Sequence, residues 1–241
     1  MWSRVWLGLS LLLALDAAAE TLRIGFGTDK PPYVFENEAR GLEYDIVAAA
    51  ARRAGFTLEV HYAPMERLHL ALRRGDLDCI ATTAARSGVE AYYSATYIQY
   101  HNAVAALSSR NYRITSVADL GGYSISAFQR ARLLLGPAFE AMAEGNPRYR
   151  EEALQINRNR LLYSGRTDVV VGDPRILRYF NAQVAEQVDT RQALTWYFIF
   201  EPTPYSVGFQ SEAQRDRFDQ GLAAIRASGE YLEIERRYTD Y

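Results

Sequence analysis

The sequence predicts an α/β fold in which strands and helices alternate around a mostly parallel, doubly wound sheet. Two short amphipathic helices are expected over residues 42–54 and 64–74, and each is closed by a glycine, Gly55 or Gly75. The apolar run over residues 76–83 follows the second helix and is typical of a buried parallel strand. This alternation favours a parallel sheet whose neighbouring strands are connected by crossover helices.

The first part of the chain supplies three strands and a candidate binding loop. Strands are expected over residues 21–26, 58–62 and 78–82, with a proline-containing loop over residues 27–33 after the first. In open α/β sheets, ligands bind at the carboxyl ends of the strands. The third strand ends in side chains that could line such a site: Thr82, Thr83 and Arg86.

The chain then crosses to a second lobe and returns. The first crossing is expected near residues 103–107, and the second lobe has predicted strands over residues 123–128 and 168–171. A stretch over residues 196–200 runs back, and the chain rejoins the first lobe over residues 205–209. Two crossings allow the lobes to hinge without separating. The predicted boundaries are a signal peptide at 1–19, a first lobe at 20–106, a second lobe at 107–203 and completion of the first lobe at 204–241.

Residues 1–19 have the pattern of a cleavable secretory signal. Arg4 provides the positive charge, residues 5–15 form an apolar stretch, and residues 17–19 are three alanines that resemble a cleavage site. The apolar stretch is shorter than the roughly 20 residues that a transmembrane helix needs. The residue directly after the cleavage site is Glu20 and not a cysteine, so no lipid attachment is indicated. The protein is therefore expected to be secreted, without a membrane anchor.

The composition argues against several other classes. The 241 residues include 27 basic and 29 acidic side chains, which is not the strongly basic balance of a nucleic-acid-binding protein. Cys79 is the only cysteine, so a disulfide framework is excluded. The three histidines have no metal-ligand spacing, and no nucleophile motif is present. The sequence therefore predicts no metal site, no cofactor and no catalytic residues.

Several motifs in sequence order resemble the extracellular solute-binding proteins of family 3, the receptors of polar amino acid ABC transporters. The resemblance covers nearly all of the chain after the signal. It rests on these segments: Gly-Leu-Glu-Tyr-Asp at 41–45, Leu-Arg-Arg-Gly-Asp-Leu-Asp at 72–78, the Thr-to-Arg loop at 83–86, Tyr-Tyr-Ser at 92–94, residues 114–122, Ser-Gly-Arg-Thr-Asp-Val-Val-Val-Gly-Asp at 164–173, and the closing helices at 218–241.

The resemblance implies a two-lobed periplasmic binding protein of the type II fold. Such a protein would close on a small carboxylate-bearing solute, a polar amino acid or a derivative, and deliver it to an inner-membrane ABC permease. The family also implies a periplasmic monomer. Binding, and not chemistry, would be its output.

The resemblance also implies roles for particular residues. Arg86 would bind the ligand carboxylate, and Asp173 would take the amino group while it caps the helix that begins at Pro174. The other expected binding residues are Thr82 and Thr83 beside Arg86, Tyr33 against the ligand side chain, and Phe128 and Arg132 at the start of a helix in the second lobe.

This sequence departs from the family pattern in two places. Arg130 and Arg132 stand where small donors are usual, which indicates either a more acidic ligand or a pair of surface arginines. The loop between Thr83 and Arg86 is also shorter than in typical amino acid receptors, which leaves the position of Arg86 open.

Two other functions remain possible on the same scaffold. One is a dehydratase of cyclic dienyl acids such as prephenate or arogenate, with Glu43, Glu66 or Asp173 as the general acid. The other is a ligand-responsive partner of a membrane sensor. The sequence alone does not choose between transport and sensing.

Overall fold

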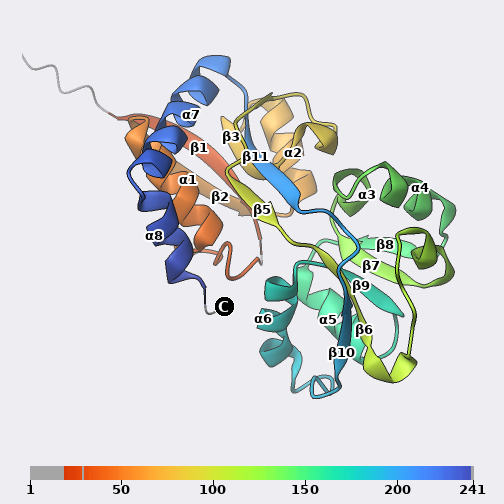
Figure 1. The fold of residues 1–241 in the computed structure, drawn as a ribbon. Coiled ribbons are helices and arrows are strands. Elements are labelled where there is room, and N and C mark those ends of the chain that lie inside the picture. Colours follow the sequence, from red (N-terminus) through yellow and green to blue (C-terminus); the bar gives the residue numbers. More distant parts are fainter. Residues whose placement is uncertain (1–18, 29, 240–241) are drawn as a thin grey trace, which may run out of the picture.

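The computed structural model describes residues 19–28 and 30–239. Within these residues the chain forms two lobes, each built on its own sheet (Figure 1). The predicted signal peptide lies outside the described residues, apart from Ala19. The predicted α/β fold with two lobes is confirmed.

The first lobe contains a six-stranded sheet in the order β2-β1-β3-β11-β4, with β5 paired to β11. Helices α1 and α7 pack against each other, and α8 contacts both. The elements of this lobe are β1 (Glu20–Gly27), α1 (Leu42–Arg53), β2 (Phe56–Ala63), α2 (Met65–Arg74), β3 (Cys79–Thr83), η1 (Ala85–Ser87), β4 (Tyr92–Tyr93), β5 (Ile98–Tyr100), β11 (Thr203–Phe209), α7 (Glu212–Ala227) and α8 (Glu230–Arg237).

The second lobe contains a five-stranded sheet in the order β10-β6-β9-β7-β8. Helices α5 and α6 pack together beside this sheet (Figure 1). The elements are β6 (Ala103–Leu107), η2 (Ser108–Arg110), η3 (Ala118–Gly122), β7 (Ile125–Phe128), α3 (Ala131–Leu134), α4 (Pro137–Gly145), β8 (Tyr149–Glu152), α5 (Gln155–Tyr163), β9 (Val169–Gly172), α6 (Pro174–Val184) and β10 (Leu194–Tyr197).

Each sheet combines a parallel part with an antiparallel part. In the first sheet β1 is parallel to β2 and β3, whereas β11 is antiparallel to β3, β4 and β5. In the second sheet β7 is parallel to β8 and β9, whereas β6 is antiparallel to β9 and β10. The antiparallel strands are those next to the two chain crossings. The parallel strands end in the loops that face the other lobe.

The first crossing comes earlier than the sequence predicts. Strand β6 pairs with β9 and β10, so Ala103–Leu107 already belongs to the second sheet. The chain therefore crosses at residues 101–102, between β5 and β6, and not at the predicted boundary of 106/107. The cause of the error is that a fully buried apolar strand has the same pattern in either sheet. The second crossing lies between β10 and β11, next to the predicted boundary at 203/204.

Helix α1 packs against α7 through a buried face that also carries Glu43. Its residues 43, 46, 47 and 50 recur at helical spacing and are all buried. Close packing of α1 on α7 requires a glycine at position 221, because a Cβ there would lie 2.1 Å from the Ala50 carbonyl oxygen. This face is apolar except for Glu43, which is consequently carried into the interior of the lobe.

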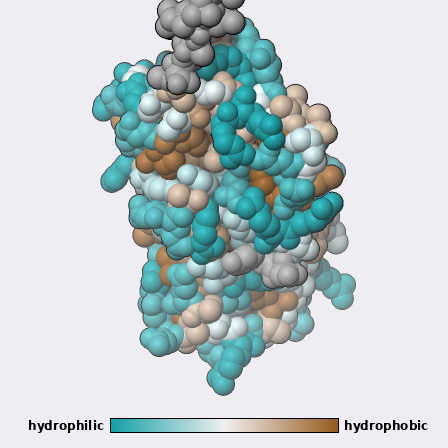
Figure 2. All heavy atoms as spheres, turned by 90° about the vertical axis from the view of Figure 1, so that its left-hand side faces the viewer, coloured by the Kyte–Doolittle hydropathy of each residue, from teal (hydrophilic) through white to brown (hydrophobic). Residues whose placement is uncertain are grey.

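The outside of the molecule is largely hydrophilic on the face shown in Figure 2, with hydrophobic residues in separate small areas. Large hydrophobic side chains at the surface of the described chain are dispersed among different elements: Leu70, Tyr92, Leu154, Phe198 and Leu232. No helix among the described residues is long and apolar enough to cross a membrane.

Candidate functional site

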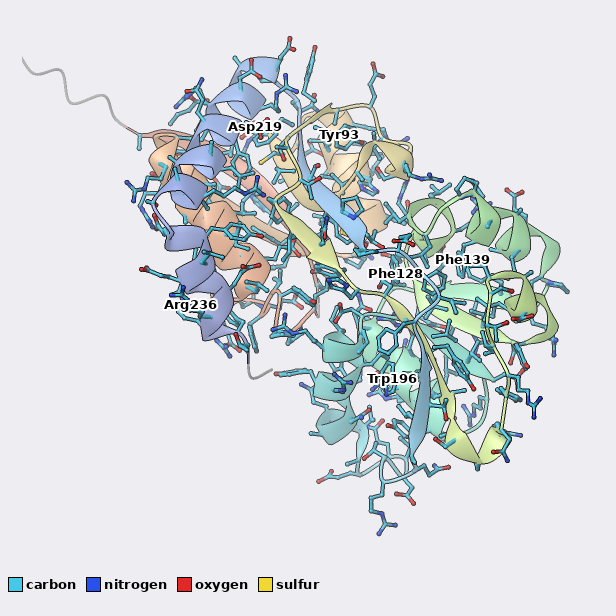
Figure 3. The ribbon with its side chains drawn as sticks, in the orientation of Figure 1. Tyr93, Phe128, Phe139, Trp196, Asp219 and Arg236 are labelled. Carbon is cyan, nitrogen blue, oxygen red and sulfur yellow. The ribbon has the colours of Figure 1, made fainter. Side chains whose placement is uncertain are left out.

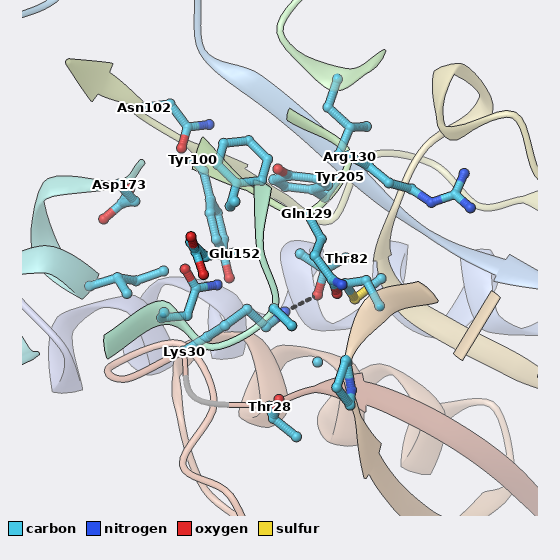
Figure 4. A pocket seen from close by; sticks show the side chains of 18 of the residues that line it. Thr28, Lys30, Thr82, Tyr100, Asn102, Gln129, Arg130, Glu152, Asp173 and Tyr205 are labelled. Atoms are coloured by element: carbon cyan, nitrogen blue, oxygen red, sulfur yellow. Dashed lines mark hydrogen bonds between the residues drawn. The ribbon is translucent and has the colours of Figure 1, made fainter. Parts of the chain in front are cut away.

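A cavity of about 50 Å³ lies between the two lobes. It is lined from the first lobe by residues at or just after the carboxyl ends of β1 and β3, including Lys30 and Thr82, and from the second lobe by residues at or just after the carboxyl ends of β7 and β9. The second-lobe lining includes Phe128, which lies on the side of that lobe facing the first (Figure 3), and Asp173 (Figure 4). A space of this size holds a few water molecules when the lobes are this close.

The first lobe contributes a buried charged cluster. The Glu43 carboxylate is fully buried and accepts hydrogen bonds from the hydroxyls of Tyr97 (2.7 Å), Tyr100 (2.5 Å) and Thr82. The Lys30 ammonium lies 3.4 Å from Glu43 Oε2 and donates to Thr82 Oγ1, the contact drawn as a dashed line in Figure 4. Burial lowers the pKa of Lys30, and the charge of Glu43 opposes that shift. Each buried charge is thus paired and hydrogen-bonded, as burial requires.

Thr82 is held in an unusual backbone conformation. Its φ is +55°, in the left-handed region that a β-branched residue rarely adopts. The Thr82 N–H donates to the Tyr97 hydroxyl at 2.9 Å, and its side chain joins Lys30 to Glu43. Strained residues of this kind persist where surrounding contacts hold them, and they gather at binding sites.

The second lobe contributes a buried carboxylate at the start of α6. Asp173 Oδ1 accepts the backbone N–H of Arg175 at 2.9 Å, so this side chain is the N-cap of the helix. Its Oδ2 accepts the hydroxyl of Tyr33, from the first lobe, also at 2.9 Å. Burial raises the pKa of Asp173, and the Tyr33 hydrogen bond opposes this shift. Asp173 therefore lines the cavity and links the two lobes.

Two arginines of the second lobe also line the cavity. Arg130 forms an ion pair with Glu66 of the first lobe at 2.8 Å and donates to the Ser87 carbonyl oxygen. Arg158 is buried on α5, where its Nη1 donates to the Val171 carbonyl oxygen at 2.5 Å. Burial lowers the pKa of Arg158 to about 10, so its guanidinium stays charged at neutral pH.

Of the residues predicted to bind, Thr82, Phe128 and Asp173 line the cavity. Tyr33 does not, although its hydroxyl contacts Asp173; its ring stacks on Tyr100 with 4.0 Å between centroids and borders a separate, more open groove. Thr83 lies behind the cavity wall. Its Oγ1 is within hydrogen-bond distance of His69 Nε2, at 3.2 Å, and the side chain is buried.

The structure places Arg86 and Arg132 outside the cavity lining, contrary to expectation. Arg86 sits in the short 3-10 turn η1, where its side chain is exposed and its Nε donates to the Leu133 carbonyl oxygen of the second lobe at 3.2 Å. This turn follows the end of β3 at once and directs residue 86 to the rim. Arg132 is exposed on α3 and lies 3.5 Å from Glu144. The expected arrangement of Arg86 and Asp173 facing each other across one cavity is therefore not present in this structure.

The sequence assigns no binding role to Lys30 or Arg158, and it names Glu43 only as a possible general acid of the dehydratase alternative. The sequence nevertheless contains a signal that could have indicated a buried or binding role for each of these three residues. Lys30 is the only lysine of an arginine-rich chain and follows the first strand directly. Glu43 is aligned with the buried Ile46 and Val47 of α1, and Arg158 lies one turn before the buried Leu162 of α5. A charge within an apolar helical face indicates a buried partner or a ligand.

No group of three or more histidine, cysteine, aspartate or glutamate side chains that could hold a metal ion occurs within residues 19–28 and 30–239.

The model of the bacterial extracellular solute-binding proteins, family 3, matches residues 22–241. The chain belongs to this family. The match spans both lobes and both crossings, and members of this family are extracellular or periplasmic binding proteins. A search of curated protein sequences finds no match.

Solved structures with the same fold include an ancestral arginine-binding protein bound to arginine, with a TM-score of 0.75 and 20% identity over 92% of this chain and 99% of that one. The arginine-, lysine-, histidine-binding protein ArtJ from Geobacillus stearothermophilus has a TM-score of 0.73 and 16% identity over 92% and 96% of the two chains. A histidine kinase sensor domain with similarity to periplasmic binding proteins has a TM-score of 0.74 and 21% identity over 92% and 97%. At these identities the likeness establishes the type II periplasmic binding protein fold, which receptors and a sensor domain share.

Proposed function

We propose that the protein is a monomeric periplasmic receptor that closes on a small carboxylate-bearing solute, a polar amino acid or a derivative. It would deliver this solute to an inner-membrane ABC permease. The observation that carries this proposal is the cavity between the lobes, which is lined by buried charges of both signs. A zwitterion needs one cation and one anion when it is removed from water.

Asp173 is the proposed partner of the ligand ammonium. It is a carboxylate that lines the cavity, as Glu152 does, and it accepts a hydrogen bond from Tyr33 of the other lobe. Burial favours its neutral form, so a bound ammonium would stabilise its charged form. Related structures bound to glutamine, arginine and histidine agree with a ligand of this class.

The test is a thermal-shift screen of amino acids, dipeptides, polyamines and dicarboxylates, followed by calorimetry. A ligand at a hundred times its dissociation constant stabilises the folded state by about 2.7 kcal/mol. For a chain of this size that corresponds to an increase in Tm of about 5–10 °C. The absence of any shift across the whole panel would contradict the proposal.

A matched pair of variants links any shift to the cavity. Asp173→Asn keeps a side chain that can cap α6 but removes the negative charge, so amino acids should bind the variant far more weakly. Asp119→Asn is the control, since Asp119 also accepts backbone N–H groups, from Thr115 and Ser116, but lies outside the cavity. Equal binding by wild type and Asp173→Asn would contradict the role given to Asp173.

A further inference from the structure

Arg158 is a buried cation most of whose hydrogen-bond donors have no acceptor among the described residues. Its side chain is 1% exposed and lines the cavity between the lobes. A guanidinium has five N–H donors. Within the described residues, the hydrogen bond that it makes is the one from Nη1 to the Val171 carbonyl oxygen, and its buried Nε has no partner.

The other two cations that line the cavity each have a carboxylate partner, which Arg158 lacks. Lys30 is paired with Glu43 at 3.4 Å, and Arg130 with Glu66 at 2.8 Å. For Arg158, no carboxylate of residues 19–28 and 30–239 lies within the 4.0 Å of an ion pair. A buried charge without a partner is costly, and that cost is removed when an anion binds beside it.

Neither of the acidic side chains whose charges act on Arg158 is hydrogen-bonded to it. Asp173 and Glu152 both act on Arg158 through their charges. The two oxygens of Asp173 accept Tyr33 and the backbone of Arg175, and Glu152 lies 3.2 Å from Arg150 Nε. Arg158 therefore has negative charge in its surroundings but no bidentate partner.

The sheet beside Arg158 is shaped to receive its guanidinium. A Cβ at Gly172 would lie 2.2 Å from Arg158 Nη1 and 3.0 Å from its Cζ, so any side chain at the end of β9 would displace the group. Gln155, one turn earlier on α5, also lines the cavity and has a buried Oε1 without a partner in the described chain. Buried polar groups in folded proteins are normally satisfied, so these atoms mark a place for ligand atoms.

We propose that Arg158 is the anion anchor of the cavity and binds the carboxylate of the solute through its planar fork of donors. This inference rests on the proposed function and specifies its binding residue. The head group of the solute is then held mainly by the second lobe, with its carboxylate on Arg158 and its ammonium at Asp173. Arg86 joins the lobes at the rim instead of holding the solute.

The experiment compares three variants by calorimetry with the twenty L-amino acids and their α-carboxamides as probes. Arg158→Met removes the charge with a side chain of similar length and should weaken binding of the best amino acid by about 30-fold or more. The preference of wild type for that acid over its carboxamide should also disappear. Arg158→Lys keeps a point charge but lacks the planar fork of donors, and it should weaken binding of the amino acid by about tenfold. Arg86→Met is the matched control and should stay within about threefold of wild type.

The possible results distinguish a wrong assignment of Arg158 from a wrong proposed function. If wild type binds an amino acid and Arg158→Met binds it equally well, or if Arg86→Met alone loses it, Arg158 is not the anchor. If Arg158→Met does not fold by circular dichroism, Arg158→Lys and Gly172→Ala decide. Both variants should weaken binding of the amino acid more than binding of its carboxamide. Equal effects on the two affinities would overturn the assignment. If wild type binds neither the twenty amino acids nor any other member of the thermal-shift panel, the proposed function fails, and the anchor with it.

Discussion

His69 makes folding stability depend on pH in a way that the structure specifies. Its imidazole is 1% exposed on α2 beside the cavity, with Nε2 3.2 Å from Thr83 Oγ1 and a buried Nδ1 that has no partner among the described residues. Burial lowers the pKa of His69 to about 4, and the positive charges of Arg130 and Arg73 add to this effect while Glu66 opposes it. The folded protein therefore keeps this side chain neutral at pH 5.

The sign and size of the effect follow from the difference between folded and unfolded states. Between pH 6.5 and pH 4 the unfolded chain binds a proton at residue 69 and the folded protein does not, so the free energy of unfolding falls as the pH falls through this range. The whole effect is about 3 kcal/mol, because one pKa unit corresponds to about 1.4 kcal/mol. Between pH 7 and pH 5 the expected loss is about 2 kcal/mol.

The measurement is urea unfolding of wild type, His69→Gln and His61→Gln at pH 7 and pH 5. Glutamine at position 69 keeps a polar group near Thr83 but cannot take up the proton. The His69→Gln variant should lose about 2 kcal/mol less than wild type between the two pH values. His61 is the control because its side chain is 46% exposed beside Glu59, and its variant should lose as much as wild type. Equal losses for wild type and His69→Gln would refute the reasoning.

Two further predictions concern the buried contacts around the cavity. Lys30→Met should lower the free energy of unfolding by about 3–5 kcal/mol because it leaves the buried Glu43 carboxylate without a cation, and the double variant Lys30→Met/Glu43→Gln should recover most of that loss in urea unfolding. If the single and double variants are equally unstable, the unpaired Glu43 carboxylate is not the cause of the loss. Tyr33→Phe keeps the ring on Tyr100 but removes the hydroxyl 2.9 Å from Asp173, and it should cost about 1.5–3 kcal/mol because a charged acceptor loses a buried donor. An unchanged urea midpoint would show that this link between the lobes contributes nothing to stability.

Much of the fold could be predicted from local patterns. The helix over residues 64–74 ends where the sequence places it, because Gly75 adopts φ +77° and closes the last turn. The buried strand at Cys79–Thr83 follows from a short run of apolar residues and threonines without a charge. The assignment of Ala103–Leu107 to the second sheet could not be predicted in this way, since it depends on pairing with β9, far along the chain.

The site was harder to predict than the fold because side-chain direction depends on tertiary contacts. Asp173 was predictable, since an acidic residue before a proline at the end of a buried strand is both an N-cap and a cleft residue. Arg86 was not, because the 3-10 turn that directs it to the rim depends on a short loop. Glu43 is accommodated by Tyr97 and Tyr100, more than fifty residues away, so its burial has no local cause.

Lobe closure and solute binding involve many of the same side chains. The contacts described between the lobes include the hydrogen bond from Tyr33 to Asp173, that from Arg86 to the Leu133 carbonyl oxygen, and the ion pair of Arg130 with Glu66. The Tyr33 hydrogen bond contributes about 1.5–3 kcal/mol and the other two contacts on the order of 1 kcal/mol or less each, so together they stabilise the closed arrangement by only a few kcal/mol. Micromolar binding corresponds to about 8 kcal/mol, which exceeds that sum. A solute held by Arg158 and Asp173, which both belong to the second lobe, would shift the balance toward closed lobes only by the part of that affinity that depends on first-lobe groups such as Thr82, because a ligand moves a conformational equilibrium by its differential affinity alone.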